Sequence, residues 1–157
     1  MIEIPLTQGK VAIIDDEDWP LVSSHKWHAS AKTNYSITSW YAVDSKRIPM
    51  HQILGGKRWD HINGDSLDNR RSNLRPATHQ QNNCNTGAHF SSTSKYKGVS
   101  WATRQTKWVA QIKVFGHNKH IGVFTDEHKA ALAYDQAARQ YHGEFAWLNA
   151  DHFEELR

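Results

Sequence analysis

In the C-terminal half of this 157-residue chain, apolar residues first alternate as in a strand and then recur at helical spacing. This change of period limits the possible folds more than any other feature of the sequence. Three β-type runs, 97–101, 107–115 and 119–124, are joined by polar or glycine turns. Alternate residues of the middle run are apolar, namely Trp108, Ala110, Ile112 and Val114. Alanines and tyrosines then recur at helical spacing over 130–141, with Thr125 or Asp126 as N-cap and Gly143 as stop. The pattern predicts a three-stranded antiparallel sheet packed on one α-helix.

Charge differs between the predicted sheet and the predicted helix. Residues 96–125 carry five basic and no acidic side chains, whereas residues 126–157 carry three basic and seven acidic ones. An acidic helix on the apolar face would leave the basic face of the sheet open to solvent. A cationic surface interleaved with aromatic residues suits a phosphate backbone and base edges, so nucleic acid is the predicted partner. A solvated lysine-bearing sheet is the alternative.

Composition excludes several other classes of protein. One cysteine, Cys84, cannot form an internal disulfide or a paired-cysteine zinc site, so a metal would need oxygen or imidazole ligands. No run has the length and apolarity of a membrane span, and the N-terminus lacks the features of a signal peptide. We therefore expect a soluble cytoplasmic protein with no membrane partner and no small-molecule cofactor.

Residues 96–149 resemble the plant APETALA/ethylene-response-factor (ERF) DNA-binding domain in the order and spacing of several segments. These segments are Tyr96-Lys97-Gly98-Val99, Trp108-Val109-Ala110-Gln111-Ile112, Ile121-Gly122-Val123-Phe124, Ala130-Ala131-Leu132-Ala133-Tyr134-Asp135 and Leu148-Asn149. The resemblance implies that the sheet enters the major groove of double-stranded DNA. Its implied DNA-contacting positions are Lys97, Arg104, Gln111, Lys113 and His120. Ser100 and His120 stand where plant members often carry arginine and tryptophan, and we expect Trp101 and Trp108 to be core residues.

The N-terminal half is β-rich at its start. Residues 2–6 and 10–14 indicate a hairpin, residues 15–18 a solvated acidic turn, and residues 19–22 a short helix. Two further short strands are expected around Trp27, Tyr35 and Val43, with no pairing readable. The small polar residues of 86–95 are typical of a linker. We therefore expect one domain over 1–85 and a second, DNA-binding domain over 96–157.

Residues 59–78 contain many carboxylates, amides and arginines and have little to bury, which is the composition of a site. A hard cation such as Mg²⁺ takes one or two oxygen ligands from protein and fills the rest with water and phosphate oxygens. Asp60 and a side-chain amide would suffice. A neutral histidine beside such a metal, His61, can take a proton from the water that attacks a phosphodiester.

The same residues resemble the HNH nuclease family in its phage and intron homing branch, through Asp60-His61-Ile62-Asn63-Gly64, Asp68-Asn69-Arg70 and Asn73-Leu74-Arg75. The resemblance implies a ββα-metal fold and catalytic roles for His61, as general base, and Asn73, which pins the loop. It implies Asp60 and Asn82 as ligands of one divalent metal, Mg²⁺ with Mn²⁺ as an alternative. Asn82 is chosen over the adjacent Asn83 by its spacing from Asn73. The resemblance also implies the cytoplasm of a bacterial or phage-infected cell.

Several readings stay open at this point. Arg70, Arg71 and Arg75 would meet phosphates or form surface salt bridges. His25, His51 and His79 are expected to be surface or satisfied histidines. Strand alternation sends Asp60 and His61 to opposite faces, which a strand end or twist must reconcile.

The predicted fold class is α+β, with an N-terminal ββα-metal module and a C-terminal sheet and helix. The predicted function is a metal-dependent endonuclease of the HNH homing type that hydrolyses phosphodiester bonds of DNA. A DNA-binding regulator with an HNH-like scaffold is the first alternative, and a ribonuclease or structured-RNA binder is the second.

Overall fold

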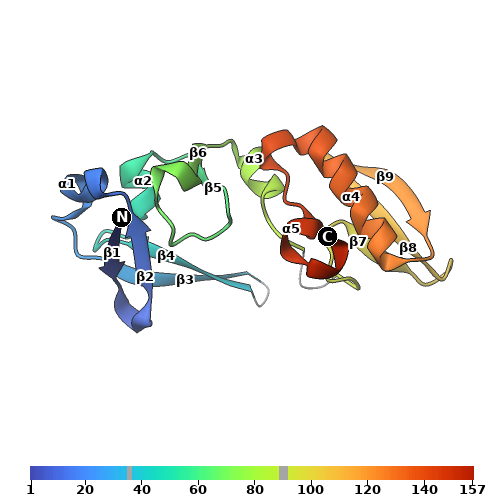
Figure 1. The fold of residues 1–157 in the computed structure, drawn as a ribbon, viewed down its shortest axis with the longest axis horizontal. Coiled ribbons are helices and arrows are strands. Elements are labelled where there is room, and N and C mark those ends of the chain that lie inside the picture. The colour runs from blue at the N-terminus through green and yellow to red at the C-terminus, as the bar shows by residue number, and fades with distance from the viewer. Residues whose placement is uncertain (35–36, 89–91) are drawn as a thin grey trace. The chain divides into compact units, whose positions relative to one another are not determined.

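The computed structural model describes residues 1–34, 37–88 and 92–157, which form two compact units, Met1–His79 and Gln80–Arg157 (Figure 1). The division falls inside the segment that the sequence assigns to the nuclease domain, and residues 89–91 of the expected linker lie outside the described part. The expected domain limits stay a prediction. No helix within the described ranges is long and apolar enough to cross a membrane.

The first unit begins with the hairpin that the sequence predicts. Strands β1 (Ile2–Pro5) and β2 (Val11–Ile14) pair antiparallel around the 3-10 turn η1 (Thr7–Gly9), and η2 (Asp16–Asp18) leads into α1 (Trp19–Val22). Strands β3 (His28–Asn34) and β4 (Ile37–Val43) form a second antiparallel pair before α2 (Met50–Leu54). Tyr35, expected on a strand, lies outside the described residues.

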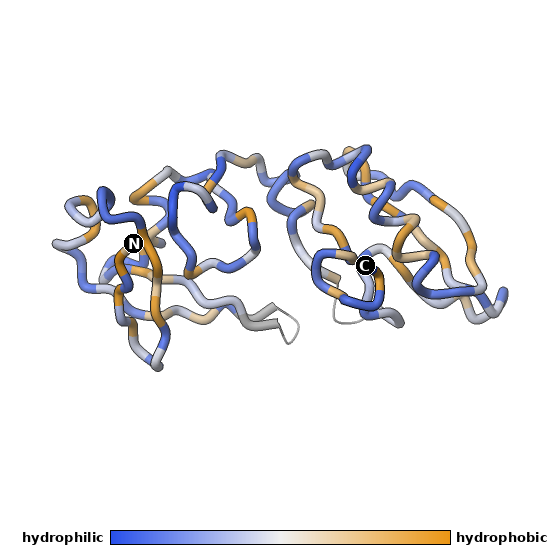
Figure 2. Tube along the Cα trace, viewed as in Figure 1, coloured by the Kyte–Doolittle hydropathy of each residue, from blue (hydrophilic) through white to orange (hydrophobic). Residues whose placement is uncertain are grey.

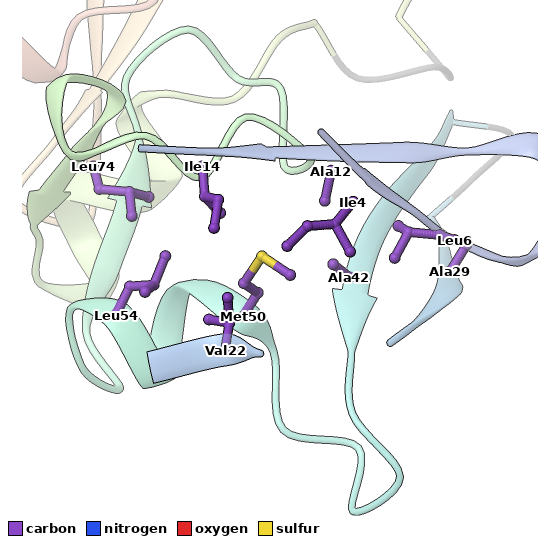
Figure 3. Close-up of a cluster of buried hydrophobic side chains, with 10 residues drawn as sticks. All are labelled: Ile4, Leu6, Ala12, Ile14, Val22, Ala29, Ala42, Met50, Leu54 and Leu74. Atoms are coloured by element: carbon purple, nitrogen blue, oxygen red, sulfur yellow. The ribbon is translucent and has the colours of Figure 1, made fainter. Parts of the chain in front are cut away.

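The core of this unit collects small and medium apolar side chains from each of these strands and α-helices (Figure 3). Alternation along β2 turns Ala12 and Ile14 inward and leaves Val11 exposed, as a strand with one solvated face requires. Figure 3 shows Met50 of α2 between Val22 and Ile4, where it is fully buried. A flexible thioether fills such an irregular gap between short elements well.

The segment after α2 contains β5 (Trp59–His61), the 3-10 turn η3 (Arg71–Asn73) and β6 (Leu74–Pro76). Strands β5 and β6 pair antiparallel, with Asp60 opposite Arg75 and His61 opposite Leu74. The loop that joins them is mostly hydrophilic (Figure 2). Gly55 follows the end of α2. A Cβ at this position would lie 2.2 Å from Trp59 Cδ2, so glycine leaves room for the ring of Trp59 beside the helix end.

The second unit starts with α3 (His79–Cys84), whose first residue still belongs to the first unit. Strands β7 (Val99–Ala102), β8 (Lys107–Val114) and β9 (His117–Phe124) form the predicted antiparallel meander, with a bulge between Ala110 and Gln111. Helix α4 (Glu127–His142) follows, then η4 (Gly143–Phe145), α5 (Asn149–His152) and η5 (Glu154–Leu156). The N-cap is Asp126, which accepts a hydrogen bond from Lys129 N, and Gly143 ends the helix as predicted.

Helix α4 packs its alanines and Tyr134 against the apolar face of the sheet. Gly98 has φ 75°, and a Cβ there would lie 2.0 Å from Tyr134 Cδ2, so glycine permits both the turn and the close approach. Trp108 lies against this core, but the expectation for Trp101 is wrong because 37% of it is exposed. Residues 92–94 of the expected linker are anchored to the unit, since Ser94 Oγ donates to Glu127 Oε1 at 2.7 Å.

Candidate active site

The β5–β6 hairpin brings a carboxylate and a guanidinium together inside the first unit. Asp60 and Arg75 are both buried, and Oδ2 of Asp60 accepts hydrogen bonds from Arg75 Nε at 3.2 Å and Nη2 at 3.0 Å. Burying one of these charges alone would be costly, so each charge compensates the other in the interior of the unit. Arg75, for which the sequence left phosphate contact and a surface salt bridge open, forms a buried ion pair here.

His61 is the last residue of β5, and its ring is buried. Its Nε2 lies 3.3 Å from Oδ1 of Asn69, whose Nδ2 donates to the carbonyl of Leu67 at 3.0 Å. Because the Leu67 carbonyl can only accept, the amide of Asn69 is oriented with its oxygen toward His61, and Nε2 of His61 must donate. A neutral ring then carries its lone pair on Nδ1.

Burial lowers the pKa of His61, and the bond to Asn69 with the charges of Asp60, Asp65 and Asp68 opposes this shift. The net direction is downward, so His61 is neutral at neutral pH and can accept a proton. The sequence identified His61 but gave no role to Asn69. The signal that could have found it is its place in the Asp68-Asn69-Arg70 motif.

Asn73 ties together the two ends of the loop over 62–73. Its Oδ1 accepts from Asn63 N at 2.9 Å and its Nδ2 donates to the carbonyl of Asp68 at 2.8 Å. The backbone adds a bond from Ile62 N to the carbonyl of Asn73 at 2.8 Å. Both side-chain partners lie within the loop, so Asn73 fixes the path of the chain on either side of Asn69.

The loop is also fastened to β2 and to the acidic turn that follows it. Ile13 N donates to the carbonyl of Leu67 at 2.9 Å, and Asn69 N donates to the carbonyl of Ile13 at 2.8 Å. The expectation that residues 15–18 are only solvated is wrong, because Asp18 is buried and accepts from Arg71 Nη2 at 2.7 Å. The acidic turn therefore positions the loop, a role that its local sequence does not reveal.

His51 on α2 is a second buried imidazole in this cluster. Its ring meets that of His61 edge to face, with the ring centroids 5.0 Å apart. Burial and the nearby charge of His61 lower the pKa of His51 to about 4. The sequence grouped His51 with surface or satisfied histidines, and the structure instead places it against the predicted general base.

The other predicted residues of this half are distributed as follows. Arg70 pairs with Asp68 at 2.7 Å, so all three arginines of the loop region bind carboxylates, which is the alternative that the sequence left open. Asn82 and Asn83 are exposed on α3, within the second unit, so the site is described from the first unit alone. No group of three or more His, Cys, Asp and Glu side chains suited to a metal occurs in ranges 1–34, 37–88 and 92–157.

A separate polar surface lies on the second unit. Gln111 and His120 are directly paired across β8 and β9, Lys113 pairs with Asn118, and the side chains of these residues are exposed. Arg104 is exposed in the turn before β8. Lys97 differs, because its ammonium donates to the carbonyl of Cys84 at 2.6 Å and burial lowers its pKa to about 8. Among the five DNA contacts predicted in this unit, Lys97 thus has its ammonium on a backbone carbonyl of α3.

Comparison with known proteins gives matches to both halves. The profile of a family described as HNH endonuclease matches residues 55–84. The uncharacterized HNH endonuclease L560 of Acanthamoeba polyphaga mimivirus is 32% identical over 152 residues, which cover 90% of this chain and 76% of that protein. Protein 3.8 of Escherichia phage T7 is 31% identical over 87 residues, 55% of this chain and 71% of that protein.

Plant transcription factors match over a shorter stretch. The AP2-like ethylene-responsive transcription factor TOE2 of Arabidopsis thaliana is 36% identical over 70 residues, which cover 43% of this chain and 14% of that protein. No solved structure matches. The viral match therefore extends over most of both chains, whereas the plant match is confined to a small part of a much longer protein.

Proposed function

This chain belongs to the HNH endonuclease family and is a nuclease, and we propose that it is a metal-dependent endonuclease of the homing type that hydrolyses double-stranded DNA. One observation carries the proposal. Adjacent residues at the end of β5 supply an ion-paired carboxylate, Asp60, and a neutral imidazole, His61, held by Asn69. The viral and phage relatives support the cytoplasm of an infected cell as its place of action.

In this proposal His61 is the general base. Its Nδ1 takes a proton from water, the resulting hydroxide attacks phosphorus, and the bond from phosphorus to the 3′ oxygen breaks; that oxygen takes a proton from solvent and leaves as a 3′-hydroxyl, with a phosphate on the 5′ side. Asn69 keeps the proton on Nε2, so that Nδ1 is the basic atom. Asn73 acts indirectly, by fixing the loop that carries Asn69.

Asp60 and Asn82, with Asn83 as the alternative, would hold one divalent cation, Mg²⁺ or Mn²⁺. Carboxylate and amide oxygens are the donors such ions prefer, and one or two protein ligands are enough for Mg²⁺. Asp60 fits this role as a carboxylate on β5, directly beside His61. When bound, the cation would stabilise negative charge on the phosphate and the departing oxygen.

The second unit is proposed to recognise DNA through β8 and β9, as an APETALA/ERF-like module. Exposed Gln111, Lys113 and His120 on neighbouring strands, with Arg104 nearby, support this role. Arg70, Arg71 and Arg75 are also proposed to contact phosphates, because a guanidinium has five N–H donors and can stay paired with its carboxylate. The domain limits proposed for the two activities remain 1–85 and 96–157, joined by 86–95.

The first experiment incubates supercoiled plasmid with the full chain and Mg²⁺, with EDTA, or with the His61→Ala variant. We expect nicked or linear DNA only with the wild-type chain and Mg²⁺, and a loss of about 10²- to 10⁴-fold in rate for His61→Ala. Normal cutting by that variant, or cutting of RNA but not DNA, would overturn the proposal.

A second experiment tests the ligand assignment. Asp60→Ala should abolish cutting at every Mg²⁺ concentration while DNA binding is retained. Because it leaves Arg75 as a buried charge, a destabilisation of about 3–5 kcal/mol is also expected. Asp18→Asn is the matched control, since it weakens another carboxylate–arginine pair of the same unit, one whose aspartate is buried, and should leave the Mg²⁺ dependence unchanged. Equal Mg²⁺ dependence in both variants would contradict the assignment.

A further inference from the structure

The connection between β8 and β9 is a turn with an unusual residue. Val114 pairs with His117, so only Phe115 and Gly116 join the strands, and their φ angles are 49° and 85°. A two-residue hairpin loop with two positive φ angles is the type I′ pattern, which asparagine, aspartate and glycine adopt most readily. Phenylalanine has no such preference, so Phe115 makes this turn less favourable than asparagine would.

The side chain of Phe115 does not compensate for this cost by packing in the core of its unit. Phe115 is 81% exposed, the largest exposed fraction among the large apolar residues described, and it belongs to neither apolar cluster of its unit. A strained backbone that carries an exposed aromatic ring contributes little to folding. Such a feature points to contact with a ligand.

The surroundings indicate the chemistry of that ligand. Residues 113–120 include two lysines and two histidines, and no carboxylate occurs from residue 96 to residue 125. Lys113 and His117, on either side of the turn, are exposed. An apolar ring among cationic groups matches a partner that combines negative charge with flat apolar faces. Nucleic acid has both properties, through its phosphates and its bases.

We propose that Phe115 is a nucleobase contact at the end of the β8–β9 surface, an inference that rests on the proposed DNA recognition by these strands. The shared chemistry is an apolar contact with a base. Two sources can supply it, the methyl group of thymine in the major groove or the face of a base that the ring unstacks.

The test uses a substitution that separates folding from binding. Phe115→Asn places a favoured residue in the turn, so the melting temperature of the second unit should rise. The same variant should bind a randomised, fluorescein-labelled duplex about ten-fold more weakly in EDTA, at an unchanged salt slope because no charge is lost. If affinity is unchanged or rises with stability, Phe115 has only a structural role and the proposal is overturned.

Two further variants keep the result interpretable. Phe115→Tyr preserves an aromatic face and should bind like the wild type, so equal affinity of the Tyr and Asn variants would also overturn the proposal. Leu132→Gln removes another exposed apolar side chain, from α4, and should leave affinity unchanged.

Lys113→Ala tests the proposed DNA recognition by β8 and β9, on which this inference rests. If it weakens binding and Phe115→Asn does not, only the present inference fails, and if neither does, recognition by β8 and β9 fails too.

The two sources of the contact are then distinguished with modified duplexes. Replacing thymine by uracil in the pool should weaken wild-type binding but not Phe115→Asn binding if the methyl group is the contact. A fluorescent adenine analogue that brightens on unstacking should respond to the wild type and not to Phe115→Asn if the ring inserts beside a base. A wild-type response in neither duplex would overturn the proposal.

Discussion

Asn73 in the first unit and Asn149 in the second are both buried asparagines whose side chains hydrogen-bond to the backbone of another segment, but their surroundings differ. Asn73 connects Asn63 to Asp68 within a loop that also buries His61 and Asn69. Asn149 accepts from Lys97 N at 2.8 Å and donates to Asp135 Oδ1 at 3.0 Å, beside an apolar sheet–helix core. Among the described residues, ten buried polar side chains lie in the first unit and three in the second.

This difference shows what each unit depends on. The second unit is stabilised mainly by apolar packing, and the hydrogen bonds of Asn149 add to that packing. The loop of the first unit has few apolar residues to bury, so hydrogen bonds and ion pairs must fix its path. A polar network of this kind is sensitive to the loss of any member, because each partner left behind is buried without a hydrogen bond.

The largest expected effect comes from removing the two asparagines. Asn73→Ala leaves Asn63 N and the Asp68 carbonyl without their partner and should cost the first unit about 3 kcal/mol. Asn149→Ala should cost the second unit a similar amount. Amide hydrogen exchange on the full chain, read residue by residue, should show each loss confined to its own unit. Faster exchange in both units for either variant would contradict independent stabilisation.

Acidification should also separate the units. The pKa of His51 is about 4 in the folded protein against 6.5 in an unfolded chain. Between these values the unfolded chain binds a proton that the folded chain does not, so stability falls as the pH decreases from 6.5 to 4, by up to about 3 kcal/mol. His61 shifts in the same direction and adds to the loss.

In the second unit, Lys97 determines the pH range over which stability is expected to change. Its pKa is about 8 in the folded unit and 10.5 as a free side chain, so its burial favours folding progressively as the pH rises from 8 to 10.5. Unfolding of each unit followed by hydrogen exchange across pH should show these two windows. His51→Phe should remove the His51 share of the acid effect, and an unaltered acid profile in that variant would refute the assignment.

The three strands and helix α4 of the second unit could be predicted from the sequence, for a physical reason. Alternation along β8 and helical spacing along α4 record which face each residue buries, and Asp126 and Gly143 mark the helix ends by their local chemistry. Trp101 was misplaced because alternation assigns a face and not a position within it. It pairs with Trp108 at one end of the sheet, where 37% of it stays exposed.

The candidate site was predicted in its residues and only partly in its contacts. The spacing of Asp60, His61 and Asn73 identified the segment through a resemblance, whereas the roles of Asn69 and His51 depend on contacts that no periodic pattern encodes. The ion pair of Asp18 with Arg71 joins residues distant in sequence, and neither residue indicates its partner. Hydrogen-bonded loops are specified by geometry, which a single sequence does not display.

A smaller effect is expected for His51 in activity. If its ring positions His61, His51→Ala should lower the cutting rate about ten-fold at unchanged DNA affinity, because an edge-to-face pair is worth up to about 1.5 kcal/mol. His51→Phe keeps an aromatic ring at this position and should recover most of the rate. Equal rates for the wild type and both variants in single-turnover plasmid nicking would exclude a positioning role.

The smallest expected effect distinguishes two lysines of the second unit. Lys113 is exposed on β8, so Lys113→Ala should weaken duplex binding a few-fold and lower the salt slope by about one. Lys97 has its ammonium on the carbonyl of Cys84, so Lys97→Ala should change stability and leave the salt slope as it is. Affinity titrations of the full chain at several salt concentrations measure both slopes. Equal slopes for the two variants would mean that Lys97 leaves the Cys84 carbonyl to reach phosphate, and the contrast drawn between these lysines would be wrong.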